Sequence, residues 1–278
     1  MRQLCTAGIA AGLLALTGCM QADMLIKVRH DGSGTIVSRV TMSKGQAESM
    51  GEFTEATGTF SEESARQNAA NYGPGVEFVS YRQIDEDDRF GMEATYAFQT
   101  IGALAIAPMN QGPGVEETGE RIFFTFTPEE GGRLTISLPP DAEPEVEVPE
   151  PSEAELNMAM GMMRSMTAGM KVRMALEVEG GFGWTNTRNV AGNVITILEF
   201  DFDEIAADED NLREYVKVSE SPSKARGLDG IVYPENNPIM IEFGESGGGL
   251  SSSTLMIIGG AVLLLVVFLL SSVRIRSA

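Results

Sequence analysis

One stretch of the sequence decides the fold class: residues 24–42 read MLIKVRHDGSGTIVSRVTM. Its two halves are rich in β-branched residues that alternate with polar ones, a pattern typical of strands with one buried face. The Asp31-Gly32 pair between them favours a tight turn, because glycine readily adopts the left-handed backbone that such turns require. We therefore predict a β-hairpin, in which Asp31 and Ser33 are turn residues rather than parts of a catalytic site.

Strand and turn signals recur along the rest of the chain. Further hairpins are predicted at residues 76–100 and 121–138, and further strands at 172–178, 184–190, 194–202 and 238–243. Ser61 and Ser152 are predicted helix N-caps, the latter in a capping box with Glu155, and a short helix is predicted at residues 208–216. These elements predict an α+β fold: an antiparallel, β-rich exterior domain with a few helices, plus one C-terminal transmembrane helix.

The start of the chain has the layout of an exported lipoprotein. Residues 1–18 combine a basic start with a short apolar run, which is the pattern of an export signal. The tetrapeptide Leu16-Thr17-Gly18-Cys19 resembles the lipobox, in which the signal is removed before a cysteine that carries a diacylglyceryl group. This resemblance predicts lipid attachment at Cys19. The alternative is an ordinary signal peptide followed by a chance cysteine.

A second membrane signal lies near the other end of the chain. Residues 254–273 contain no charged side chain, and about 20 apolar residues of helix are enough to cross a bilayer. Arg274 and Arg276 follow and favour the cytoplasmic side, so the main domain is predicted to face the periplasm or the cell exterior of a bacterial cytoplasmic membrane. The predicted organisation is a signal peptide (1–18), an exterior domain (19–243) with a Pro/Glu-rich loop or linker (139–151), a Gly/Ser linker (244–253), the transmembrane helix (254–273) and a cytoplasmic tail (274–278).

Charge and cysteine content restrict the partners and the means of stabilisation. The 278 residues include 40 acidic and 20 basic side chains, which gives a net charge of −20. Such an excess of negative charge repels the phosphate backbone, so nucleic acid is excluded as a partner. The two cysteines are Cys5, within the signal, and Cys19. The exterior domain therefore has no cysteine pair for a disulfide and must depend on an apolar core.

The overall layout resembles that of LppM-like envelope lipoproteins of bacteria. The resemblance comprises the lipobox, the early DGSGT turn, the β-rich exterior portion and the C-terminal membrane helix, and it is strongest in residues 26–40 and 170–202. No catalytic residue is carried over by it. What the resemblance implies is an envelope domain that binds a lipid or a protein partner.

Methionine is the one unusual feature of the exterior domain. Met158, Met162, Met166 and Met170 recur every four residues, which on a helix forms a slowly winding stripe. Three interpretations are open: adaptable core filler on a helix packed against the sheet, a groove for a hydrophobic ligand or partner flanked by Trp184, and a copper(I) site of thioethers. The first is favoured because methionine commonly fills cores.

The chain offers no set of side chains for catalysis. His30 is the only histidine, and no serine lies in the setting of an activated nucleophile. We therefore predict a non-enzymatic module, without metal or cofactor, that binds a hydrophobic ligand or a membrane protein partner near the bilayer. It would be held by membrane lipid through Cys19 and by residues 254–273. The alternative is a structural or assembly adaptor of a membrane complex.

Overall fold

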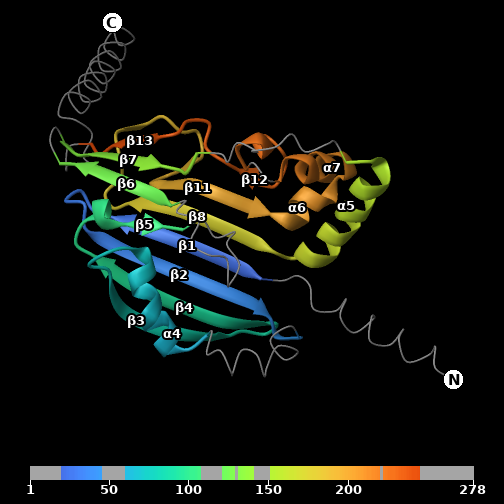
Figure 1. The fold of residues 1–278 in the computed structure, drawn as a ribbon. Helices are drawn as coiled ribbons and strands as arrows, with labels where there is room; N and C mark the ends of the chain where they lie inside the picture. Colours follow the sequence, from blue (N-terminus) through green and yellow to red (C-terminus); the bar gives the residue numbers. More distant parts are fainter. Residues whose placement is uncertain are drawn as a thin grey trace, which may run out of the picture. The chain divides into compact units, whose positions relative to one another are not determined.

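The computed structural model describes residues 20–45, 60–107, 121–128, 131–140, 151–219 and 222–244, which belong to one compact unit (Figure 1). The predicted lipidation site at Cys19, most of the loop at 139–151 and the hydrophobic segment 254–273 lie outside these residues. Among the residues that are described, no helix is both long and apolar enough to span a bilayer.

Two β-sheets make up most of the described domain. The larger sheet has the strand order β10-β11-β8-β1-β2-β4-β3, with β12 also paired to β11, and the smaller has the order β5-β6-β7-β13-β9. The strands of the larger sheet are β1 (Gln21–Val28), β2 (Gly34–Ser43), β3 (Glu77–Asp85), β4 (Arg89–Phe98), β8 (Lys171–Val178), β10 (Val190–Ala191), β11 (Val194–Asp201) and β12 (Ile231–Val232). Those of the smaller sheet are β5 (Ala105–Ile106), β6 (Ile122–Thr127), β7 (Arg133–Ser137), β9 (Trp184–Thr185) and β13 (Ile239–Glu242).

Four α-helices and three short 3-10 helices are described alongside the sheets. They are α4 (Glu62–Asn68), α5 (Glu153–Thr167), α6 (Phe202–Ala207), α7 (Glu209–Val218), η2 (Ala69–Tyr72), η3 (Ile101–Ala103) and η5 (Pro222–Ala225). Both predicted N-caps are confirmed. Ser61 accepts a hydrogen bond from the Ser64 backbone N–H, and Ser152 forms the expected reciprocal capping box with Glu155. Strand-rich architecture with a few helices confirms the α+β class.

The predicted first hairpin is confirmed. β1 and β2 pair antiparallel, and Gly32 in the connecting turn has φ +81°, the left-handed conformation that glycine tolerates. Both the backbone N–H and the hydroxyl of Ser33 donate to the Asp31 carboxylate. These two hydrogen bonds hold the pKa of Asp31 below its ordinary value. Asp31 and Ser33 thus form hydrogen bonds with each other within the turn.

The larger sheet is mixed rather than wholly antiparallel, so the prediction of an antiparallel domain is wrong at one position. β1 pairs parallel with β8, from Gln21 opposite Lys171 to Val28 opposite Val178. All its other strand pairs are antiparallel. The sequence does not reveal this because an alternating pattern fixes which face of a strand is buried but carries no information on the direction of its neighbour.

The strand predicted at residues 184–190 is also wrong, because this segment crosses from one sheet to the other. Trp184–Thr185 pairs with β13 in the smaller sheet, whereas Val190–Ala191 pairs with β11 in the larger one. The side chain of Asn186 marks the departure: its oxygen accepts from the Met240 N–H and its amide donates to the Pro238 carbonyl. The Asn186 backbone N–H still donates to the Met240 carbonyl, so the side chain adds its two hydrogen bonds at the point where the pairing ends.

The main core lies between the two sheets. Three alternate residues of β1, Met24, Ile26 and Val28, are at most 3% exposed and pack with Ile136 and Ile241 of the smaller sheet. A second, smaller core joins α5, α6 and α7 through Met160, Ile205, Leu212 and Tyr215. Because the core covers only one face of the larger sheet, the opposite face presents its polar side chains outward.

Candidate binding surfaces

Helix α5 is held against the other helices by one face only. Leu156 and Met160 are 3% and 4% exposed, and Met160 packs in the smaller core with residues of α6 and α7. The guanidinium of Arg213, on α7, lies 2.8 Å from a carboxylate oxygen of Glu153. This ion pair and the capping box secure the beginning of the helix, and the inward side chains secure its middle.

The methionine stripe faces away from that core. Met158, Met162 and Met166 are 69%, 58% and 54% exposed, so the interpretation of the stripe as core filler is wrong for these three residues. Residues four apart drift by only about 40° around a helix, which keeps all three on one side, well away from the face that carries Met160. Met170 lies beyond the end of the helix and is partly buried.

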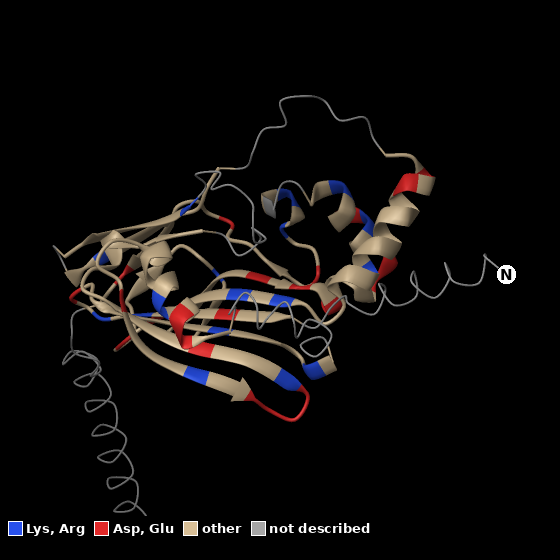
Figure 2. Ribbon diagram, turned by 60° about the horizontal axis from the view of Figure 1, so that its bottom comes forward, with Lys and Arg blue, Asp and Glu red and all other residues tan. Residues whose placement is uncertain are grey.

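The surroundings of the stripe carry little charge. From Met158 to Met166 the only charged side chain is Arg164, although the whole chain carries a net charge of −20. The other intervening residues include Ala159, Gly161 and Ser165, which are small. Figure 2 shows α5 mostly in tan, the colour of residues other than Lys, Arg, Asp and Glu. Solvent-facing sides of helices normally carry charged and polar residues, so this face is unusual for a surface that water alone covers.

Trp184 does not lie at the methionine stripe. It is 47% exposed on β9, which pairs with β13 at the edge of the smaller sheet. Strand β8 begins four residues after the end of α5, and Trp184 follows the far end of that strand. Eight residues of strand extend over roughly 25 Å. The predicted groove combining the stripe with Trp184 is therefore not assembled.

The two sides of α5 predict opposite responses to truncation. Met160→Ala is expected to lower the free energy of unfolding by about 2–5 kcal/mol, because it leaves a cavity in the smaller core. Met162→Ala is expected to change it by less than about 0.5 kcal/mol, because its side chain is already in solvent. Urea unfolding of the full-length protein in a mild detergent, followed by circular dichroism, measures both. Equal losses for the two variants would contradict the assignment of faces.

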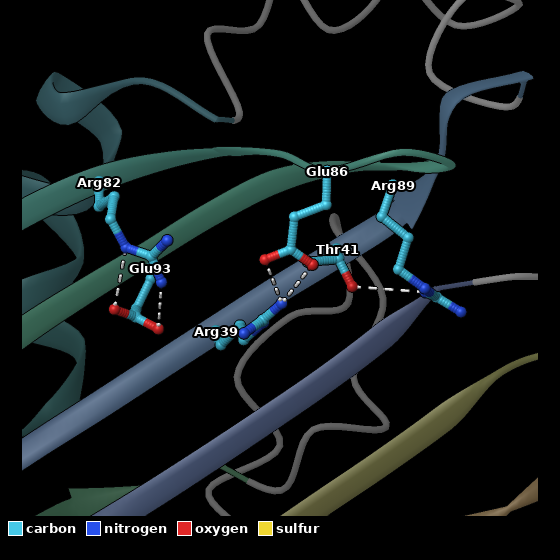
Figure 3. A network of polar contacts seen from close by, with 6 residues as sticks. All are labelled: Arg39, Thr41, Arg82, Glu86, Arg89 and Glu93. Atoms are coloured by element: carbon cyan, nitrogen blue, oxygen red, sulfur yellow. Dashed lines mark hydrogen bonds and ion pairs between the residues drawn. The ribbon is translucent and has the colours of Figure 1, made fainter.

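The outward face of the larger sheet carries a row of alternating charges. Cross-strand partners across β3, β4, β2, β1, β8 and β11 are Arg82, Glu93, Arg39, Asp23, Arg173 and Glu199 in that order. Directly opposite residues share a face, and opposite charges there favour the register. Arg82 lies 3.1 Å from Glu93 (Figure 3). On the other side of the row, Arg173 lies 3.7 Å from Glu199. The sequence alone does not reveal this row, because the row depends on the registers of five strand pairs.

A hollow of about 280 Å³ opens on this charged face, where β1 begins. Its polar lining consists of Gln21, Asp23, Arg39, Thr41, Lys171 and Arg173. Ion pairs at the margin orient two of the cations. Arg39 makes a two-fold contact with the Glu86 carboxylate at 3.0 and 3.1 Å (Figure 3), and Lys171 lies 2.7 Å from Glu199 and 3.0 Å from Asp201. Hydrogen bonds to Glu199 and then Asp201 raise the pKa of Lys171, so it stays an ammonium at neutral pH.

His30 lies where the first hairpin meets the turn after β8. Its Nε2 lies 3.2 Å from the carbonyl oxygen of Gly181, and its ring packs 5.4 Å from that of Phe243. It thereby links the first hairpin to the turn after β8. Among the described residues, no group of three or more His, Cys, Asp or Glu side chains is placed to hold a metal ion.

Comparisons with known proteins give the described domain one weak neighbour. The chain matches no family model and no curated protein. It is similar in structure to the folded domain of LppM from Mycobacterium tuberculosis, determined by NMR, with 9% sequence identity over 82% of this chain and 91% of that chain. The TM-score is 0.32, a likeness too weak to carry an argument about function.

Proposed function

We propose that this chain is a non-enzymatic, membrane-anchored envelope lipoprotein whose exterior domain binds a partner protein through the methionine stripe, Met158, Met162 and Met166. The observation that carries the proposal is the exposure of these three side chains on a helix face nearly free of charge. Methionine suits such a surface, because its unbranched, polarisable side chain adapts to partners of varied shape.

A protein partner fits this surface better than a small hydrophobic ligand. Small-molecule sites are concave and bury most of the ligand surface, whereas the stripe lies on the outer side of a helix. The inner side of α5 is filled by Leu156 and Met160, so the helix presents a firm surface. An amphipathic or apolar segment of another protein could cover the stripe along its length. The same firmness suits the alternative role of an assembly adaptor, in which the partner stays bound.

The proposed lipid anchor would place the stripe close to the membrane. The Lys171 N–H donates to the Met20 carbonyl over 3.0 Å, which joins the beginning of β1 to the segment that follows α5 (Figure 1). Met20 is the residue directly after Cys19. A lipid on Cys19 would therefore hold the C-terminal end of α5 near the bilayer, and the partner would be a membrane protein or one that works beside the membrane.

Site-specific photo-crosslinking in cells tests the proposal. A photoreactive amino acid at Met162 of the full-length chain is expected to form a discrete protein adduct, because this side chain lies in the centre of the stripe. Val79 of β3 is a matched control, since it is apolar and 55% exposed but lies on another element. The adduct should disappear when Met158 and Met166 are both replaced by glutamate, which puts charge on either side of the probe.

Two results would refute this function. One is an equal pattern of adducts from the probes at Met162 and Val79, which would show that the stripe has no preference for a partner. The other is an adduct at Met162 that persists when both neighbouring methionines are glutamate. An adduct with lipid in place of protein would show that the stripe rests on the bilayer.

A further inference from the structure

The charged residues that line the hollow on the sheet face are mostly cationic, whereas the chain as a whole is acidic. Three of its residues, Arg39, Lys171 and Arg173, are cationic and one, Asp23, is acidic. The chain as a whole has twice as many acidic as basic side chains. Three cations from two strands, β2 and β8, which flank β1, therefore converge on one concavity of an otherwise acidic protein.

Two of the lining groups have unused hydrogen-bonding capacity. Asp23 Oδ1 is buried and accepts no hydrogen bond from the residues that the structure describes, and Arg173 Nη1 lies 4.0 Å away. Within the described structure, Arg173 makes only this contact and a 3.7 Å contact with Glu199, both too long for hydrogen bonds. A guanidinium has five N–H donors, and an orphaned carboxylate oxygen is costly to leave unpaired. The site therefore offers donors and an acceptor side by side.

The charge around the hollow indicates the kind of ligand. The three cations are faced from the margin by Glu86, Glu199 and Asp201, as well as by Asp23 within the lining, so positive and negative groups are nearly balanced. A multiply charged anion would gain little from such a site, because nearby carboxylates repel it. A zwitterion is suited to it, since its anionic part can bind the guanidinium while its cationic part binds Asp23.

We propose that this hollow binds a phosphate ester that carries a primary ammonium group, as in phosphoethanolamine. The phosphate accepts hydrogen bonds from Arg173, with Arg39 and Lys171 beside it, because guanidinium groups match phosphate oxygens in two-fold contacts. The ammonium donates to the Asp23 carboxylate, whose side chain is 48% exposed. The volume of about 280 Å³ is sufficient for a headgroup.

The position of the hollow favours a lipid headgroup as the source of this ligand. Gln21 and Asp23 lie two and four residues after Cys19, so the proposed lipid anchor would keep the hollow beside the membrane surface. That part of the argument rests on the proposed function, whereas the recognition chemistry does not. The site lies on the sheet and shares no residue with the methionine stripe, so the two proposals can fail independently.

Calorimetric titration of the full-length protein in maltoside micelles tests the site. Three soluble probes are compared: glycerophosphoethanolamine, glycerophosphocholine and inorganic phosphate. The first is expected to bind at least about five times more tightly than the second, because a trimethylated nitrogen has no N–H to donate to Asp23. Native mass spectrometry of the same sample with added phosphatidylethanolamine or phosphatidylcholine then distinguishes a lipid source from a free molecule. If the protein retains phosphatidylethanolamine, the ligand is a lipid headgroup. If it does not, the ligand is the soluble ester.

Three variants relate binding to the named groups. Asp23→Asn, which preserves size, and Arg173→Gln are each expected to weaken binding of glycerophosphoethanolamine about tenfold or more. Arg82→Gln is the matched control, because Arg82 pairs with Glu93 on the same sheet face but lies outside the hollow, and it should bind as the parent does. Equal binding of the ethanolamine and choline probes, no binding of either, or unchanged binding after Asp23→Asn and Arg173→Gln would overturn the proposal.

Discussion

Cys19→Ser is expected to abolish lipid attachment to the chain and to leave the signal peptide uncleaved. In the lipobox that Leu16-Thr17-Gly18-Cys19 resembles, the cysteine thiol is the atom that is acylated, and a serine hydroxyl is far less nucleophilic. Metabolic labelling with a radioactive fatty acid should give a labelled band for the parent and none for the variant. The variant should also migrate more slowly on a gel, because residues 1–18 remain attached.

The control for this experiment is Cys5→Ser, which alters the other cysteine of the chain and should leave labelling intact. The variant at Cys19 is still expected in the membrane fraction, because residues 254–273 are predicted to span the bilayer. Undiminished label in the Cys19→Ser protein would reject the lipobox interpretation. Loss of membrane association in that variant would instead reject the predicted transmembrane helix.

The hairpins were predictable from the sequence because their information is local. Between β1 and β2, the alternation of apolar residues defines the buried face and Asp31-Gly32 defines the turn, all within a short stretch. The capping box at Ser152 and Glu155 is local in the same way. The parallel pairing of β1 with β8 is not, because Met24 and Met174 are far apart in sequence and nothing in either strand specifies the other.

The methionine helix shows why a site is harder to predict than an element. The periodicity of Met158, Met162 and Met166 correctly predicts that they share one face of a helix. It does not predict whether that face is packed, because Leu156 and Met160 offer a second apolar face on the same helix. The choice between the two faces is made by α6 and α7, which pack against the second one. Helix α6 itself was not predicted, because its first two residues, Phe202 and Asp203, continue the alternation of apolar and acidic residues at the end of β11.

The hollow also depends on contacts between segments distant in the sequence. Arg39, Asp23 and Arg173 each look like an ordinary polar residue on the outward face of its own strand. They become neighbours only because β2, β1 and β8 pair in one register, so that Arg39, Asp23 and Arg173 stand directly opposite one another. A shift of one residue in either pairing would move the partners to opposite faces of the sheet. Alternation of charge across the strands therefore both stabilises the register and creates the site.

A glycine in the first hairpin is expected to be among the most sensitive positions of the described domain. Gly34 lies opposite Val28 at the beginning of β2, and a Cβ built there would lie 2.0 Å from the Lys27 carbonyl oxygen and 2.7 Å from Cζ of Phe98. The Phe98 ring is buried in the main core, and the carbonyl belongs to the backbone of β1, so neither can give way cheaply. Gly34→Ala must push apart two central strands.

We therefore expect Gly34→Ala to lower the free energy of unfolding by more than about 3 kcal/mol. Gly161→Ala, the same chemical change, should raise it by about 0.5–1 kcal/mol, because Gly161 lies exposed in α5 with no atom near its missing Cβ and alanine favours helix. Urea midpoints of the full-length parent and both variants, measured in one detergent, give the two differences. A Gly34→Ala protein as stable as the parent would show that β1 and β2 do not meet as closely as described. A destabilised Gly161→Ala protein would show that something other than solvent covers that side of α5.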